Sequence, residues 1–146
     1  MRTMKDFLTT EQERQVVESI RAAESRTRGE IRVVITTRRV WFRQRKAWRL
    51  FDRLGMRRTE HRNGALIVLF VRMRAFVIIG DEGLDSRVDA GYWSRLAEQM
   101  TARLREGCRV EALTETIRAL GETMAGHWPA GDGENPDELP DAIHRD

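Results

Sequence analysis

Four carboxylates lie close together directly after the most apolar part of the sequence: Asp81, Glu82, Asp85 and Asp89. Carboxylates held about 5 Å apart repel one another by several kcal/mol when they are partly shielded from water, so a stable segment needs a compensating cation. That cation can be an arginine or a metal ion. A functional site is therefore expected first of all within residues 81–89.

Two interpretations of these carboxylates are open. In the first, Arg62 or Arg87 pairs with a carboxylate, or Asp85 caps the helix that follows, where a negative charge suits the free N–H groups. In the second, they bind calcium or magnesium, which prefer oxygen ligands. The spacing matches no known calcium loop such as D-x-[DN]-x-[DN]-G, which favours the first interpretation. The candidate metal ligands are Asp81, Glu82, Asp85, Asp89 and Asn63.

Other chemistry has little support in the sequence. It contains none of the common catalytic or nucleotide-binding motifs, so no organic cofactor is expected. Its single cysteine, Cys108, rules out an intramolecular disulfide and fits a reducing compartment. The longest apolar run, residues 65–71, is much shorter than the roughly 20 residues of a membrane span, and no apolar secretory segment opens the sequence. A cytoplasmic protein without a membrane span is predicted.

Basic residues far outnumber acidic ones between positions 26 and 62, although the net charge of the whole chain is only +3. Here arginines alternate with Trp41, Phe42 and Trp48, a pattern that is typical of nucleic-acid surfaces. However, the apolar residues between positions 47 and 54 recur at helical spacing, so they are better explained as the buried face of a helix with arginines on its wet side. Nucleic-acid binding is not expected.

Alternating helices and strands must position these residues. Helices are predicted from about Thr9 or Thr10 to a point before Gly29 and over residues 42–54, 88–104 and 110–124. Strands are predicted over residues 30–37, 65–71 and 75–79. The strand–helix–strand order makes the first two strands parallel, and the short connection at residues 72–74 makes the third antiparallel. The fold class is therefore α/β, a three-layer α/β/α sandwich with a small mixed central sheet. Glu30, Asn63 and Asp81 then converge on one edge of that sheet.

The length of 146 residues suits one domain. All three prolines lie from position 129 onward, in an acidic stretch that also contains glycines. We therefore expect a single domain over residues 1–129 and an acidic Pro/Gly-rich tail over residues 130–146 that adds little to the core. Leu139 and Ile143 could still dock on the basic face around residues 38–58.

Four stretches of the sequence together resemble the TPM domain family: "SRTRGEIRVVI", "AWRLFDRLGMRRTEHRNGALIVLFV", "FVIIGDEGLDSRV" and "GETMAGHWPAGDGENPDELPDAI". The most specific pieces are "RNG" before an apolar strand and "IGDEGL" after the next strand. The resemblance covers about residues 7–143 and implies the same three-layer α/β/α sandwich. Where relatives often carry an acidic residue in the hairpin turn, this chain has "RMRAF", which argues against a carboxylate site at that end of the sheet.

Function is less uniform than fold in this family, which includes calcium-binding members and a thylakoid-lumen protein linked to acid phosphatase activity. The resemblance implies a small module that binds divalent cations, calcium above all, and interacts with an unidentified protein partner as a monomer or weak dimer. The alternative is a weak metal-dependent acid phosphatase acting on phosphomonoesters through a metal-bound water. Whether the protein is an enzyme is left open at this point.

Overall fold

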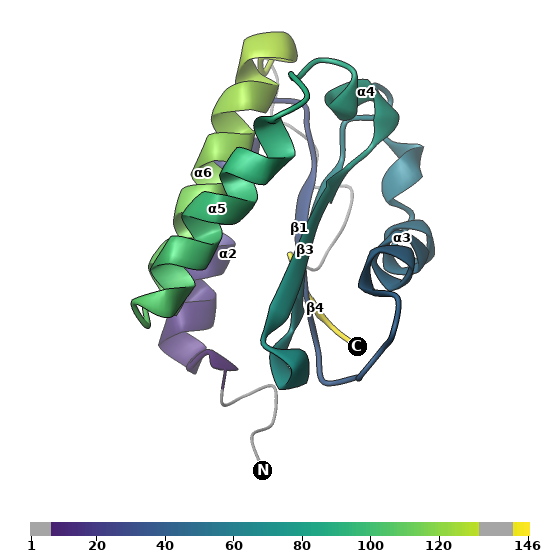
Figure 1. Ribbon diagram of the computed structural model, residues 1–146. Coiled ribbons are helices and arrows are strands. Elements are labelled where there is room, and N and C mark those ends of the chain that lie inside the picture. Colours follow the sequence, from purple (N-terminus) through teal and green to yellow (C-terminus); the bar gives the residue numbers. More distant parts are fainter. Residues whose placement is uncertain (1–6, 132–141) are drawn as a thin grey trace.

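The structure is a computed structural model that describes residues 7–131 and 142–146. Figure 1 shows a central sheet with helices on both of its faces. The helices are α2 (Thr10–Glu24), α3 (Arg43–Arg53), α4 (Glu82–Asp85), α5 (Tyr92–Arg105) and α6 (Arg109–His127), with short 3-10 turns η1 (Met56–Arg58) and η2 (Val71–Met73). The strands are β1 (Ile31–Thr36), β2 (Ala65–Phe70), β3 (Ala75–Gly80) and β4 (Ile143–Arg145).

The strands of the sheet lie in the order β3-β2-β1-β4. β1 runs parallel to β2, with Ile31 opposite Ala65, and β2 runs antiparallel to β3, with Phe70 opposite Ala75. α2, α5 and α6 cover one face of the sheet, and α3 covers the other (Figure 1). The predicted α/β/α sandwich with a mixed sheet is therefore confirmed, and so are its parallel pair and its hairpin.

The helix boundaries follow from local chemistry. Thr9 accepts a hydrogen bond from the N–H of Gln12, whose side chain in turn accepts one from the N–H of Thr9, so a capping box starts α2 where the sequence predicted it. The face of α2 that points inward packs closely on α6, since a Cβ on Gly121 would lie 2.7 Å from the Cβ of Ala23. None of the helices in residues 7–131 and 142–146 is long and apolar enough to cross a membrane.

The sheet has a fourth strand that the sequence did not predict. β4 lies parallel to β1, with Val33 opposite Ile143, so the end of the predicted tail returns to the sheet instead of lying outside the core. Ile143 packs against the larger apolar cluster, on the face of the sheet opposite α3, so its predicted docking on the basic face around residues 38–58 is wrong. Leu139 lies outside the described residues. A strand of three residues has too little periodicity to be recognised in sequence, and it forms because the edge of β1 offers unpaired backbone groups.

The carboxylate of Asp146 fixes the end of β4 on the basic side of the molecule. It lies 3.2 Å from Arg38 Nε, 3.2 Å from Lys46 Nζ and 3.3 Å from Arg53 Nη1, and it accepts a hydrogen bond from Thr36 Oγ1 at 3.1 Å. Burial acts to raise the pKa of Asp146, but the hydrogen bonds from Lys46 and Thr36 and the nearby positive charges outweigh it. The pKa of Asp146 is therefore below its ordinary value of 3.8.

This lowered pKa predicts a pH-dependent contribution to stability. Because the pKa is lower in the folded state than in the unfolded state, the contribution is complete above the unfolded-state value of 3.8 and is lost as the pH falls through the folded-state pKa. Urea denaturation measures the difference in unfolding free energy between the wild type and Asp146→Asn. We expect this difference to be constant around neutral pH and to vanish once the pH is below the folded-state pKa of Asp146. Glu18→Gln, a change at an exposed carboxylate on α2, should show no such difference. A difference for Asp146→Asn that does not change with pH would contradict the assigned ion pairs.

Candidate functional site

Asp81 lies at the centre of the acidic segment and is fully buried. Its two oxygens accept hydrogen bonds from Arg62, with Nε at 2.8 Å and Nη2 at 3.0 Å, and Arg57 Nη1 lies 3.5 Å away. Asp81 also caps α4 by accepting the N–H of Glu82 at 2.8 Å. The hydrogen bond to Asp81 is the main cause that raises the pKa of Arg62. The charge of Asp81 is thus balanced by arginine, as the first of the two interpretations predicted.

The backbone brings these two residues together. Arg62 precedes β2 and Asp81 follows β3, and the antiparallel pairing of these strands places both at the same end of the sheet (Figure 1). The N–H of Asp81 donates to the carbonyl oxygen of Gly64 at 2.9 Å, and the N–H of Gly83 donates to that of Arg62 at 2.8 Å. The motifs "RNG" and "GDEGL" are therefore the two halves of one structural junction.

The remaining carboxylates of the segment have separate partners. Asp85 accepts a hydrogen bond from Trp93 Nε1 at 2.8 Å, and Asp89 forms an ion pair with Arg95 at 2.6 Å, whose hydrogen bond lowers the pKa of Asp89. The side chain of Glu82 is 73% exposed and lies 3.2 Å from Arg62. Within residues 7–131 and 142–146, no group of three or more His, Cys, Asp or Glu side chains is placed to hold a metal ion.

Asn63 differs from the other predicted ligands, because it is fully buried and its side-chain oxygen and nitrogen have no hydrogen-bond partner in the described structure. A divalent ion beside it would still have to displace Arg62 from Asp81. The arrangement of these five residues therefore fits a structural junction better than it fits a metal site. Calcium or magnesium binding there stays a prediction.

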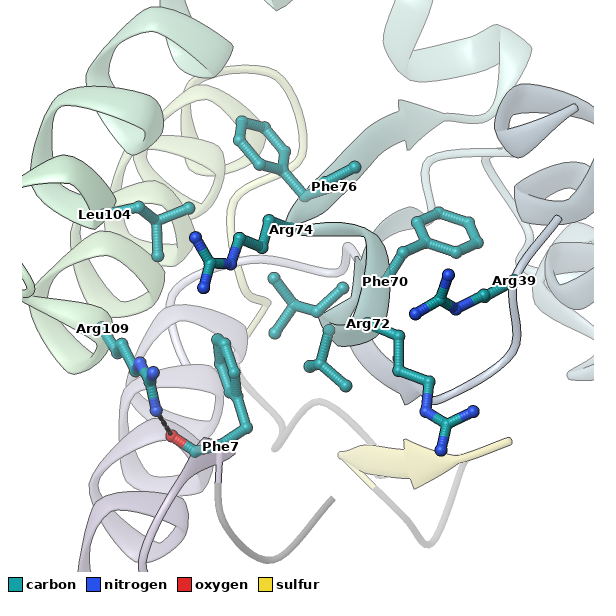
Figure 2. Close-up of a pocket in the computed structure, with 11 residues that line it drawn as sticks. Phe7, Arg39, Phe70, Arg72, Arg74, Phe76, Leu104 and Arg109 are labelled. Carbon is teal, nitrogen blue, oxygen red and sulfur yellow. Dashed lines mark hydrogen bonds between the residues drawn. The ribbon is translucent and has the colours of Figure 1, made fainter. Parts of the chain in front are cut away.

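A pocket lies at the opposite end of the sheet, around the hairpin between β2 and β3 (Figure 2). It has a volume of about 910 Å³. Its apolar lining consists of Phe7, Leu69, Phe70, Val71, Ala75, Phe76 and Leu104, and its charged lining consists of Arg39, Arg72, Arg74 and Arg109. This end is where the parallel strands β1 and β2 finish, and ligands of α/β proteins bind preferentially at the carboxyl ends of parallel strands.

Three separate segments bring the four arginines of the pocket together. Arg72 and Arg74 belong to the hairpin, where Arg74 has a positive φ of 50°, and Arg39 follows β1. Arg109 begins α6, donates to the carbonyl oxygen of Phe7 at 2.9 Å and stacks over the Phe7 ring at 4.8 Å from its centroid. Figure 2 shows the Arg74 side chain reaching toward Leu104 and the guanidinium of Arg39 lying near that of Arg72.

The charged residues that line this pocket are all arginines. No lining residue is acidic, and Arg39 and Arg74 take part in none of the ion pairs formed among the described residues. Like charges gathered around an apolar cavity repel one another, so an anion that enters relieves that repulsion. Sequence reasoning missed this site because its arginines are far apart in the chain. The two signals that point to it are "RMR" in a hairpin turn and the rule on parallel strand ends.

The layers and strand order define a small α/β/α sandwich protein with a mixed sheet. The sequence pattern of the TPM domain matches residues 2–123, and the chain belongs to the TPM domain family. The protein BA42 from the psychrophilic bacterium Bizionia argentinensis, solved by NMR, is 32% identical over 100% of both chains, with a TM-score of 0.89. The N-terminal domain of a P. gingivalis protein shares the fold, at 22% identity over 84% of this chain and 79% of that one, with a TM-score of 0.64. No curated protein matches the sequence.

Proposed function

We propose that this TPM domain is a binding domain whose pocket takes up an anion that carries an apolar portion. The observation that carries this proposal is the set of four arginines around a cavity otherwise lined by apolar side chains. Guanidinium groups recognise phosphate and carboxylate through paired, charge-assisted hydrogen bonds. The three phenylalanines of the lining offer contact area for the apolar portion.

The composition of the lining supports binding more than hydrolysis. None of the residues that line the pocket carries a carboxylate, imidazole, thiol or hydroxyl group that could act as a nucleophile, acid or base. The alternative proposal, a metal-dependent phosphatase, would need such groups from elsewhere in the chain. The protein partner that the family resemblance implies could present the anion as an acidic or phosphorylated side chain beside an apolar one.

Decyl phosphate below its critical micelle concentration is a suitable probe. We expect it to bind the wild type in isothermal titration calorimetry and to bind the double variant Arg39→Gln with Arg74→Gln roughly 100-fold more weakly, because each lost charge-assisted contact weakens binding by about tenfold. Neutral decyl glucoside should bind only weakly to either protein. Both substitutions lie at exposed side chains outside the described ion pairs, so the fold should be unaffected.

The matched control removes two positive charges elsewhere. Arg21→Gln with Arg26→Gln, both exposed near the end of α2, should bind decyl phosphate within about twofold of the wild type, because charges beyond the Debye length are screened. Equal loss in both double variants would mean that only net charge matters. Unchanged affinity in the pocket variant would place the ligand elsewhere and refute the proposal.

Divalent-cation binding at Asp81, Glu82, Asp85, Asp89 and Asn63 is a separate proposal, suggested by their oxygen-rich side chains. The double variant Asp81→Asn with Asp85→Asn tests it. From the arginine pairing we expect the metal-free variant to lose about 2 kcal/mol of unfolding free energy, because a buried ion pair is broken and a helix cap is weakened. Calcium that raises the melting temperature of the wild type but not of this variant would support a cation site. An equal rise in both proteins, or no rise in either, would reject it.

A further inference from the structure

Two aromatic side chains stand out on the surface of the molecule. Trp41 is 94% exposed and Phe42 is 66% exposed, and they are the large hydrophobic residues that the described structure leaves most exposed. They lie between β1 and α3, on the loop of residues 37–42, whereas Trp48 on α3 packs against Phe51 in the smaller apolar cluster. In the sequence, Trp41, Phe42 and Trp48 form one pattern of aromatic residues among arginines. The structure separates them, because Trp48 packs in a core cluster and Trp41 and Phe42 are exposed.

The loop that carries this pair is held by hydrogen bonds directly before the two aromatic residues. The N–H of Val40 donates to Met73 Sδ at 3.4 Å, and the N–H of Arg38 donates to Thr36 Oγ1 at 3.1 Å. The guanidinium of Arg45 lies 4.9 Å from the centroid of the Phe42 ring. Because the neighbouring residues are held, the two aromatic side chains are presented to solvent by the fold itself.

The surface around the pair is strongly basic. No acidic residue occurs between positions 31 and 51. Within the described residues, Asp146 reaches this side from the far end of the chain and pairs with Arg38, Lys46 and Arg53. We call the exposed residues of the loop and the adjoining turns the aromatic–arginine tip, which consists of Arg39, Trp41, Phe42, Arg43, Arg45, Arg72 and Arg74.

We propose that the aromatic–arginine tip docks on the surface of an anionic phospholipid membrane. Tryptophan prefers the head-group level of a bilayer, where its ring contacts both the apolar lipid and water. Arginines beside it bind lipid phosphates. The tip combines both features at one place on the molecule. This inference goes beyond the proposed pocket ligand. The tip shares Arg39, Arg72 and Arg74 with the pocket, whereas Trp41 and Phe42 lie outside the pocket lining.

The size of the apolar part favours a membrane over a protein partner. A stable protein interface buries roughly 800 Å² on each side around an apolar centre, and two adjacent aromatic side chains surrounded by cations supply only a fraction of that area. A bilayer needs no complementary surface, because shallow insertion of one or two aromatic side chains adds to the attraction between arginines and anionic lipids. Single-stranded nucleic acid could also stack on Trp41, and the experiment below distinguishes it.

The test is co-sedimentation of the protein with vesicles of phosphatidylcholine, with or without phosphatidylglycerol as about a third of the lipid. We expect binding only to the anionic vesicles, and weaker binding as salt is raised. Arg43→Gln with Arg45→Gln should weaken binding by roughly 25-fold, since each basic residue at an anionic surface contributes about a fivefold factor. Trp41→Ala with Phe42→Ala should weaken it by at least about tenfold, although the net charge is unchanged.

Several results would overturn the inference. The first is that the wild type binds neutral and anionic vesicles equally well. The second is that Trp41→Ala with Phe42→Ala binds anionic vesicles as tightly as the wild type. The third is that the wild type binds labelled oligothymidylate but does not bind vesicles. The control Arg21→Gln with Arg26→Gln should stay within about threefold of the wild type, because only charges near the surface contribute fully. Decyl phosphate titration of Trp41→Ala with Phe42→Ala should be unchanged, which separates failure of the membrane surface from failure of the pocket. Thermal unfolding checks that each variant is folded, as expected for exposed positions.

Discussion

Replacing Arg32 by leucine is expected to lower the free energy of unfolding by about 3 to 5 kcal/mol, the cost of breaking a buried ion pair from one side. Arg32 is only 2% exposed although it lies within β1. Its Nη1 is 3.5 Å from Glu24 and its Nη2 is 3.6 Å from Glu30, and both glutamates are buried too. Without the guanidinium, two carboxylates would be left in a poorly solvated place. Urea denaturation of the two proteins measures this loss directly.

The triple variant Arg32→Leu with Glu24→Gln and Glu30→Gln is the informative control. Because it also removes the negative charges of the two buried glutamates that Arg32 contacts, it should recover part of the lost stability. Some loss should remain, since Glu24 also accepts the N–H of Ile31 at 2.9 Å and glutamine has to replace that contact. Arg21→Leu, at an exposed position on α2, should change stability by less than about 0.5 kcal/mol. A similarly small change for Arg32→Leu would show that the buried charges are solvated in the native protein.

Gly83→Ala should cost about 3 kcal/mol, near the upper end for overpacking a tight site. A Cβ at this position would lie 2.1 Å from the carbonyl oxygen of His61 and 2.6 Å from that of Arg62. Both contacts are with backbone, which cannot move aside without separating α4 from the turn before β2. That turn holds the Arg62–Asp81 pair, so the substitution should weaken the whole junction. The measurement is the shift of the urea midpoint at an unchanged slope.

Gly126→Ala is the matched control for this effect. Gly126 lies within α6, and a Cβ there would meet nothing within 4 Å. Alanine has a higher helix propensity than glycine, so we expect a gain of about 0.5 to 1 kcal/mol. Opposite signs for the two variants would show that local space decides the outcome, and not the loss of glycine itself. A neutral Gly83→Ala would mean that the junction is looser than its hydrogen bonds indicate.

The sequence alone determined three of the strands, the longer helices and the order of these elements. β-branched and apolar runs predicted β1, β2 and β3, and Thr9 with Gln12 predicted the start of α2. The right-handed crossover and the short connection at residues 72–74 then determined the directions of these three strands. These features depend on residues within a few positions of one another, or on chirality rules that hold for every chain. They can therefore be predicted without knowing which distant side chains meet.

Only the tertiary structure decided which charges compensate one another and where a ligand can enter. The sequence left Asp81 with either arginine or a metal as its partner, and the pairing of β2 with β3 places Arg62 against it. β4 and the arginine pocket were not predicted, because each forms from segments that are distant in the chain. Such contacts depend on how strands pair and on which strand edges have unpaired backbone groups. The residues next to a side chain in the sequence show no pattern that identifies its distant partners.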